Sequence, residues 1–326
     1  MSVSGYDIIG DVHGCANTLA CLLRMLGYTK QDGVFYHPSR QAIFVGDIVD
    51  RGPRIREALH IVRNMVLAGT AHCVMGNHEY NALGYTTATP ETEGSDTIKY
   101  VRAHNARHNR LIAETLMQFA SYPEEWRVFL EWFRELPVYI EFDSFRVVHA
   151  CWDRQLIQTF GQSNHVAKLD KSFIQRSQHR SAFEGRFLDR LTRGTDLALP
   201  KGRTITSKDG YERHMFRTKF WALEPETFGD VVFQPDPLPD DIAQIALTEE
   251  NKKALIFYGE NEKPVFFGHY WLQGKPRPLR PNVCCLDYSA VKYGRLVAYR
   301  FDGEAQLASN KFVWVDVAPE HEAKQH

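Results

Sequence analysis

The sequence lacks any long apolar segment, which argues against a membrane-spanning helix. Such a helix needs about 18 or more consecutive apolar residues, and no stretch of the chain approaches that length. The N-terminus runs from Met1 into Tyr6-Asp7-Ile8-Ile9 without the basic and apolar segments of a secretory signal. We therefore expect a cytoplasmic protein with no membrane partner.

An excess of charge of one sign is also missing. The chain carries 39 Lys and Arg residues against 40 Asp and Glu residues, a formal net charge of −1. A chain with balanced charges creates no bulk field toward DNA, RNA or an acidic membrane. We therefore expect no general nucleic-acid binding, and the sequence carries no signal for an oligomeric state.

The six cysteines lack the spacing of a metal or disulfide motif. They are Cys15, Cys21, Cys73, Cys151, Cys284 and Cys285. Without a C-x-x-C pair or a dense framework, neither a structural zinc site nor a disulfide scaffold is expected. We expect reduced, mostly buried thiols. With 326 residues, 44% of them hydrophobic, the chain can form one large α/β domain with insertions or two ordinary domains.

What the sequence does contain is a repeated unit, in which an apolar run leads into a polar turn that starts with glycine. Residues 6–9 lead into Gly10-Asp11-Val12-His13-Gly14, residues 42–45 into Gly46-Asp47-Ile48-Val49-Asp50-Arg51-Gly52, and residues 71–75 into Gly76-Asn77-His78-Glu79. Helical periodicity follows the first two turns, at 19–26 and 55–66. The repeat predicts parallel strands with right-handed crossovers, so the three turns should open on one edge of a sheet.

The later sequence is less regular. Helical patterns cover about 97–136, and the basic stretch 102–110 could dock a phosphate-rich ligand, although a solvated basic helix face is the commoner meaning. Segments 138–142 and 145–148 predict a hairpin that ends at His149, and a strand at 265–267 ends at Gly268-His269. The proline-rich segment 234–241 predicts a stiff surface loop or linker, and segments 283–286, 295–301 and 312–315 predict an antiparallel set.

We predict a single domain over residues 1–326. A helical insertion would occupy about 95–137, and a cap or insertion region would occupy about 153–263.

The polar residues at the predicted strand ends combine carboxylates, imidazoles and an amide. They are Asp11, His13, Asp47, Asp50, Arg51, Asn77, His78, His149 and His269. This mixture suits borderline divalent metals such as Mn²⁺, Fe²⁺ and Zn²⁺ better than Ca²⁺ or Mg²⁺. Two such ions about 3.5–4 Å apart can share a water, lower its pKa from 15.7 to about 7 and clamp a phosphoryl group. Arg51 can then contact phosphate oxygens, while His78, held by Asp50, supplies a proton to the leaving alkoxide.

Turn and helix-cap chemistry is the alternative meaning of Asp and Asn residues that follow glycine. Three such turns together, each rich in metal-ligand types, favour the metal site. A single histidine at the end of an apolar run is usually a core histidine, and this is the alternative for His149 and His269. They are favoured as ligands only because a second metal would otherwise lack ligands.

The three turns resemble the three signature motifs of the calcineurin-like metallophosphoesterases. Their form is that of the phosphoprotein phosphatase (PPP) branch and its relatives, the symmetrical diadenosine tetraphosphate hydrolases. Tyr270-Trp271 leaves no histidine two residues after His269, which favours this branch over the broader phosphodiesterases. The resemblance covers residues 6–80 strongly and residues 145–153 and 264–301 weakly.

The resemblance implies an α/β fold, specifically a central mixed β-sandwich flanked by helices. It implies that Asp47 bridges two metals, of which Asp11 and His13 hold the first. The second metal would be completed by Asn77, His149 and His269. Arg51 would bind phosphate and the Asp50–His78 pair would protonate the leaving group. A second phosphate-binding arginine has no clear position in the motifs, and Arg217 is a candidate.

The function implied is a dinuclear-metal-dependent phosphohydrolase of the serine/threonine protein phosphatase-like type. A metal-bridging hydroxide would attack a phosphoester in line, with two ions of Mn²⁺, Fe²⁺ or Zn²⁺, Mn²⁺ first among them. The substrate would be a phosphoprotein, a small phosphomonoester or a nucleotide. One alternative is a dinucleoside polyphosphate hydrolase, and another is a non-catalytic module that binds a phosphorylated ligand.

Overall fold

The computed structural model describes residues 3–90, 98–162, 169–206, 212–233 and 238–319. Its strands are β1 Gly5–Ile9, β2 Thr29–Gln31, β3 Val34–Tyr36, β4 Arg40–Phe44, β5 Ala71–Cys73, β6 Tyr139–Glu141, β7 Arg146–Val148, β8 Thr195–Ala198, β9 Ile205–Thr206, β10 Glu212–Arg213, β11 Met215–Thr218, β12 Val265–Phe267, β13 Val283–Cys285, β14 Asp287–Tyr288, β15 Arg295–Phe301 and β16 Phe312–Asp316. Its α-helices are α1 Ala16–Met25, α2 Ile55–Leu67, α3 Asn77–Thr86, α4 Ala106–Gln118, α5 Pro123–Glu135, α6 Arg154–Gln162, α7 Lys171–Arg176, α8 Phe183–Arg193, α9 Phe228–Val231, α10 Asp240–Ala243 and α11 Glu249–Ala254.

The first sheet has the order β14-β15-β1-β4-β5, with β16 also paired to β15. Strand β4 runs parallel to both β1 and β5, with Ile43 opposite Ile8 on one side and His72 on the other. This confirms the three predicted parallel strands. Strand β15 pairs antiparallel with β1, β14 and β16, so the first sheet is mixed.

The second sheet has the order β13-β12-β7-β6. The predicted hairpin is present, because β6 and β7 pair antiparallel. The expectation that 283–286 joins an antiparallel set is wrong, since β13 lies parallel to β12 in this second sheet. An apolar run that is buried on both faces suits a parallel strand as well as an antiparallel one, so composition did not distinguish the two.

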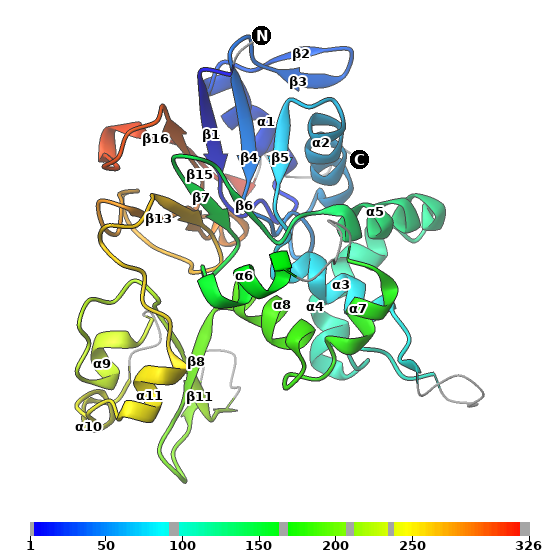
Figure 1. The fold of residues 1–326 in the computed structure, drawn as a ribbon. Helices are drawn as coiled ribbons and strands as arrows, with labels where there is room; N and C mark the ends of the chain where they lie inside the picture. The colour runs from blue at the N-terminus through cyan, green and yellow to red at the C-terminus, as the bar shows by residue number, and fades with distance from the viewer. Residues whose placement is uncertain (1–2, 91–97, 163–168, 207–211, 234–237, 320–326) are drawn as a thin grey trace.

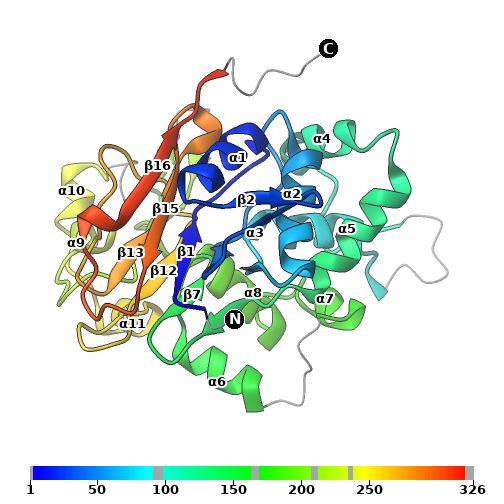
Figure 2. The same cartoon turned by 90° about the horizontal axis from the view of Figure 1, so that it is seen from above.

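The two sheets pack face to face as a β-sandwich (Figures 1 and 2). Alternation along each strand explains the packing, since Ile8 and Ile43 point into the core between the sheets together with Phe266 of β12. Ile9 and Phe44 point to the opposite face and belong to the cluster that includes the apolar sides of α1 and α2. The predicted mixed sandwich flanked by helices is confirmed.

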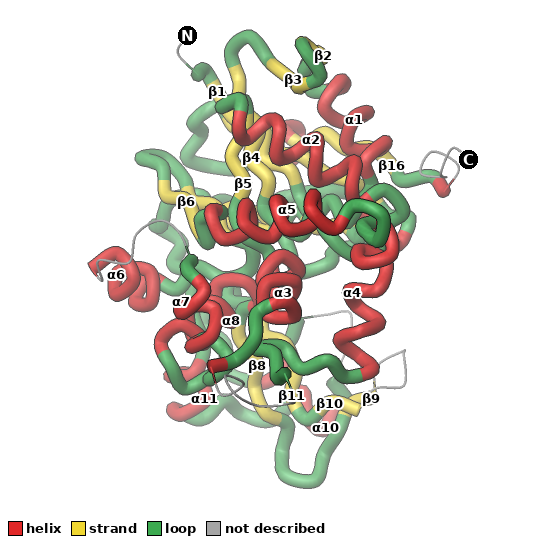
Figure 3. Tube along the Cα trace, turned by 90° about the vertical axis from the view of Figure 1, so that its right-hand side faces the viewer, coloured by secondary structure: helices red, strands yellow, loops and turns green. Residues whose placement is uncertain are grey.

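The strands β1, β4 and β5 end toward a group of helices that includes α3, α4 and α8 (Figures 1 and 3). Within the predicted helical insertion, the helices are α4 and α5, and the described residues before Ala106 form no helix. Phe129, Leu130 and Phe133 on α5 are buried, as their helical spacing predicts. The insertion itself stays a prediction.

The predicted cap region contains α6 to α11 and β8 to β11. Its later part has a small hydrophobic cluster of its own, which includes Leu197, Phe216, Val231 and Ile242. The stiff loop predicted at 234–241 is wrong at its end, because α10 begins at Asp240 directly after Pro239, and proline is accepted at a helix start. Residues 234–237 lie outside the described residues.

Among the described residues, no helix has the length and apolarity needed to cross a bilayer. All six cysteines are free, and all but Cys21 are buried, as predicted. The cytoplasmic location stays a prediction.

Candidate metal centre

Side chains from five strand ends meet at one edge of the sandwich. Asp11, Asp47 and Asn77 follow β1, β4 and β5, while His149 and His269 follow β7 and β12 of the second sheet. All five are buried. The turns after β1 and β4 also place His13 and Asp50 in this interior. Sandwich packing therefore brings together loops that are far apart in the sequence.

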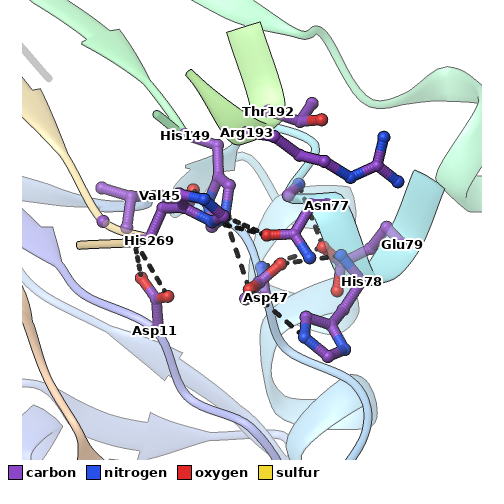
Figure 4. Close-up of polar contacts among 12 residues, drawn as sticks. Asp11, Val45, Asp47, Asn77, His78, Glu79, His149, Thr192, Arg193 and His269 are labelled. Carbon is purple, nitrogen blue, oxygen red and sulfur yellow. Dashed lines mark hydrogen bonds and ion pairs between the residues drawn. The ribbon is translucent and has the colours of Figure 1, made fainter. Parts of the chain in front are cut away.

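The carboxylate of Asp47 lies at the centre of this cluster (Figure 4). Its Oδ2 is 3.5 Å from His13 Nε2, 3.4 Å from His149 Nε2 and 3.9 Å from His78 Nε2. Two groups of side chains could each hold an ion, and Asp47 belongs to both. The groups are His13, Asp47, His78 and Asp47, His149, His269. A bridging role for Asp47 fits this arrangement.

Asn77 and Asp11 complete the cluster. Asn77 Oδ1 lies 2.7 Å from His269 Nδ1 and 3.2 Å from His149 Nε2. The carboxylate of Asp11 accepts a hydrogen bond from the backbone N–H of His269, with an N–Oδ2 distance of 3.1 Å. Asp11 therefore lies near His269. The first group of possible ligands contains His78 where the resemblance implies Asp11. The structure brings all six predicted ligands together, and their individual roles stay predictions.

The protonation of this cluster fits a cation. Burial, reinforced by the neighbouring Asp287, raises the pKa of Asp11 well above its usual range. Burial would also raise the pKa of Asp47, but His149 and His78 hold it well below that range. Burial would lower the pKa of His149, yet Asp47 and Asp11 raise it to about 10. Carboxylates that crowd together in a buried space need positive charge to remain ionised. Protonated His149 supplies such charge here, and it must release its proton before its ring nitrogen can bind a metal ion.

The remaining imidazoles are ready to act as ligands. Burial and the charge of Arg51 lower the pKa of His13, and burial and Arg217 lower that of His269. Both rings are therefore neutral at neutral pH, which is the form that binds metals. Nε2 of His269 is buried without a hydrogen-bond partner. The nitrogen of His269 that faces the cluster is Nδ1, 2.7 Å from Asn77 Oδ1, and an imidazole nitrogen beside amide and carboxylate oxygens fits a divalent ion such as Mn²⁺, Fe²⁺ or Zn²⁺.

Backbone strain is concentrated in the same loops. Among the described residues, nine non-glycine residues have positive φ, and five of them belong to this region: His13 (42°), Asp47 (53°), Asp50 (67°), Arg51 (70°) and His269 (64°). Such conformations cost free energy and persist where the surrounding structure imposes them, often at functional sites.

Two glycines of the site allow close backbone approaches. A Cβ on Gly76 would lie 2.3 Å from Asp47 Oδ1, and one on Gly268 would lie 1.9 Å from Asp11 Oδ1. Both positions exclude any side chain, so the carboxylates can pack directly against backbone.

Glu79 holds the two central turns together, a role that the sequence argument missed. Its buried carboxylate accepts hydrogen bonds from the backbone N–H groups of Asp47 (2.9 Å), Ile48 (2.8 Å) and Gly76 (3.0 Å). A Glu three residues after Gly76 was a detectable capping signal for α3. Its contacts with the turn after β4 depend on tertiary packing.

The predicted proton donor, His78, is oriented by Asp50, and Asp50 is in turn held by a residue of α4. His78 Nδ1 lies 2.6 Å from Asp50 Oδ2, and Thr115 Oγ1 of α4 donates to Asp50 Oδ1 at 2.5 Å. Thr115 carries no local signal for this role, because it reaches the site only through the packing of α4. Arg51 is exposed beside the buried cluster.

Two further arginines approach the site from the 153–263 region. Arg217 on β11 donates from Nη1 to the backbone oxygen of His269 at 3.3 Å. Arg193, at the end of α8, donates from Nη2 to Asn81 Oδ1 at 2.5 Å, and its side chain extends past Asn77 in Figure 4. Arg217, the predicted candidate for the second phosphate-binding arginine, therefore lies close to the site. Arg193 is another candidate for this role, which sequence reasoning missed.

A family model described as calcineurin-like phosphoesterase matches residues 6–189, more than half of the chain. The chain belongs to the calcineurin-like phosphoesterase family. The matched segment contains the three polar turns and His149, while His269 lies beyond it. Family membership therefore agrees with the resemblance carried by the turns.

Curated relatives within this family share parts of the chain. Bis(5'-nucleosyl)-tetraphosphatase PrpE of Halalkalibacterium halodurans, designated asymmetrical, is 32% identical over 165 residues, which cover 48% of this chain and 61% of the relative. The protein of the same name from Oceanobacillus iheyensis is 47% identical over 73 residues, 22% of this chain and 29% of the relative. The chain thus spans less than two thirds of these relatives. The turns resemble those of symmetrical hydrolases, whereas these relatives are named asymmetrical.

Among solved structures, a cold-active protein tyrosine phosphatase is similar with a TM-score of 0.51 and 17% identity. The match covers 99% of this chain and 81% of that one. At this identity the similarity supports the fold alone.

Proposed function

We propose that this protein is a dinuclear-metal-dependent phosphohydrolase that cleaves phosphoesters, as serine/threonine-type phosphatases do. The observation that carries the proposal is the position of Asp47, whose Oδ2 lies within 3.5 Å of imidazoles from two different loops in a buried cluster. A buried carboxylate shared by two groups of nitrogen and oxygen donors is the arrangement that a pair of ions requires.

The six side chains Asp11, His13, Asp47, Asn77, His149 and His269 would hold the ions, with Mn²⁺ as the first candidate. When bound, two such ions supply Lewis acidity toward phosphoryl oxygens and an activated water. The 2.7 Å distance between His269 Nδ1 and Asn77 Oδ1 supports the place of His269 in this set.

Arg51 and His78 supply what the ions do not. The exposed guanidinium of Arg51 can contact two phosphoryl oxygens at once and offset their negative charge. The Asp50 carboxylate accepts a hydrogen bond from Nδ1–H of His78, and this orients the ring with Nε2 toward the cluster. Nε2 can then carry a proton to the leaving oxygen. Thr115 keeps Asp50 in position by its own hydrogen bond.

A second candidate function is hydrolysis of a dinucleoside polyphosphate. The names of the curated relatives favour it, and so does a group of arginines next to the metal centre.

The test is turnover by protein loaded with Mn²⁺, Fe²⁺ or Zn²⁺ on four substrates: p-nitrophenyl phosphate, bis-p-nitrophenyl phosphate, a phosphoserine peptide and diadenosine tetraphosphate. Metal analysis should find about two ions per chain. Hydrolysis of at least one substrate is the expected result. A protein that holds two ions and cleaves none of the four is not a phosphohydrolase of this kind.

A further inference from the structure

An arginine-rich pocket lies beside the metal centre. Its volume is about 340 Å³, within the range of roughly 300–1,000 Å³ usual for small-molecule sites. Asn81 lines it from α3, one helical turn (about 5.4 Å) beyond Asn77 of the metal cluster. Arg193 binds Asn81 and extends past Asn77 (Figure 4). The pocket and the metal cluster are therefore neighbours along α3.

The pocket walls carry an excess of positive charge. The lining includes Arg102, Arg107, Arg180 and Arg193 against the single carboxylate of Asp189. Asp189 pairs with both Arg193 and Arg180. Burial, together with the charges of Arg193 and Arg107, lowers the pKa of Arg102 to about 10. Arg102 and Arg193 are partly buried, while Arg107 and Arg180 are exposed at the rim, and guanidinium groups that gather around one pocket favour an anion between them.

The wall that contains Arg102 is a fixed loop and not a solvated helix face. The backbone N–H of Arg102 donates to the oxygen of Gly84 at 2.9 Å, which attaches the loop to α3. The ring of His104 stacks between Tyr85 and Tyr100, with centroids 3.8 and 4.1 Å apart. The commoner meaning of the basic stretch 102–110 is therefore wrong for Arg102, whereas Arg107 is exposed on α4 as that meaning predicts and also lines the pocket.

The lining selects phosphate groups over an aromatic or apolar group. Val101 and Ala103 are its aliphatic members, and the ring of Tyr80 is already covered by the Arg193 guanidinium at 4.9 Å. A base would find little surface to stack on, whereas phosphate oxygens would find bidentate donors. Because the pocket adjoins the site where a phosphoryl group would react, a ligand that fills both must carry negative charge along its length.

We propose that this pocket binds the oligophosphate chain of the substrate, so that the metal centre acts at one end of a chain of linked phosphates. The inference rests on the metal-dependent hydrolysis of the proposed function, and it favours the second candidate there, in which the bond cleaved is a phosphoanhydride, with nucleoside oligophosphates or inorganic polyphosphate as the substrate class.

The first test measures binding to the full chain in chelator, so that no turnover occurs. Inorganic tripolyphosphate is titrated calorimetrically into wild type, Arg102→Gln and the control Arg110→Gln, which removes the same charge from an exposed position outside the pocket lining. Arg102→Gln should weaken binding at least about tenfold, the size expected for one charge-assisted hydrogen bond. Equal weakening in both variants would mean that only general charge attracts the anion, and would overturn the proposal.

Two other probes separate the possible sources of the ligand. ATP should bind about as well as tripolyphosphate, since the phosphates are what the pocket recognises. Binding of ATP without binding of tripolyphosphate would show that the base is recognised, which contradicts the proposal. An acidic phosphopeptide whose affinity depends on Arg102 as strongly as that of tripolyphosphate would also overturn it, in favour of a protein substrate.

The second test uses the metal-loaded enzyme. In Arg102→Gln the ratio of kcat/KM for diadenosine tetraphosphate to that for p-nitrophenyl phosphate should fall at least about tenfold. If wild type cleaves p-nitrophenyl phosphate and the ratio is unchanged, the pocket proposal fails while the proposed function stands. If no substrate is cleaved but tripolyphosphate binding depends on Arg102, the proposed function fails and the pocket remains a binding site for this anion.

Discussion

The strand-end loops of residues 6–80 differ sharply from the region 153–263. The loops place Asp11, His13, Asp47 and Asn77 in one buried cluster. The region 153–263 supplies none of the predicted ligands, yet its described residues include Arg193 and Arg217, which reach the edge of the cluster. The loops thus carry the residues expected to react, whereas the later region, together with Arg102 and Arg107 before it, lines the pocket beside them.

The two parts also differ in how they are stabilised. The loops adopt strained conformations between strands that are packed on both faces. The segment 195–255 has a small cluster of its own, with Leu197 and Phe216 among its members. Because the sandwich core holds the strand-end loops, substitutions in the segment 195–255 should leave the loops in place. A substitution within a loop should disturb the whole metal site.

The largest effect is expected from Asp47→Asn. Loss of the shared carboxylate charge should weaken both ions together and lower activity by about 10³-fold or more, because several kcal/mol of transition-state stabilisation depend on them. Metal analysis by mass spectrometry and the kcat/KM of the best panel substrate measure these effects. Asp240→Asn, the same change at an exposed position in the later region, is the control. Loss of only one ion would contradict the bridging role.

His78→Asn should separate proton transfer from metal binding. Without the imidazole that Asp50 orients, kcat should fall by about 10²–10⁴-fold, and most for substrates with poor leaving groups. Both ions should remain. If the variant loses an ion instead, His78 is a metal ligand, as its proximity to His13 and Asp47 would allow.

Glu79→Gln tests whether the loops depend on their backbone support. The amide keeps the size of the side chain but offers one oxygen where the carboxylate offers two to the N–H groups of Asp47, Ile48 and Gly76. We expect metal affinity to fall by about 10–100-fold, as for other groups that orient ligands. Titration of the metal-free protein with Mn²⁺ measures this. If the Mn²⁺ affinity of the variant equals that of wild type, Glu79 does not support the metal site.

The smallest effect on the site is expected from Leu197→Ala in the later region. Truncation of this buried side chain should lower the free energy of unfolding by about 2–5 kcal/mol. Because its cluster is separate from the sandwich core, the metal content should equal that of wild type. Chemical denaturation followed by metal analysis distinguishes the two effects. Loss of the ions in the folded variant would show that the later segment supports the metal centre directly.

The sequence by itself determined the parts of the protein that depend on neighbouring residues. Three apolar runs with glycine-flanked turns were enough to predict the parallel strands β1, β4 and β5 and the position of Asp47 at a strand end. The hairpin before His149 followed in the same way. Strand ends and turns are local features, because pleat alternation and glycine conformations depend on only a few consecutive residues.

Only the tertiary structure decided the contacts between distant segments. Thr115 supports Asp50 across 65 residues, and Arg193 meets Asn81 across 112 residues. The strand β13 lies parallel to β12 in the second sheet, whereas the sequence predicted an antiparallel set; both faces of β13 are buried, and such burial suits either direction. Such contacts depend on how the two sheets pack and on which helices cover their edge. They carry no periodic pattern, since each side chain is selected by a partner that the local sequence does not contain.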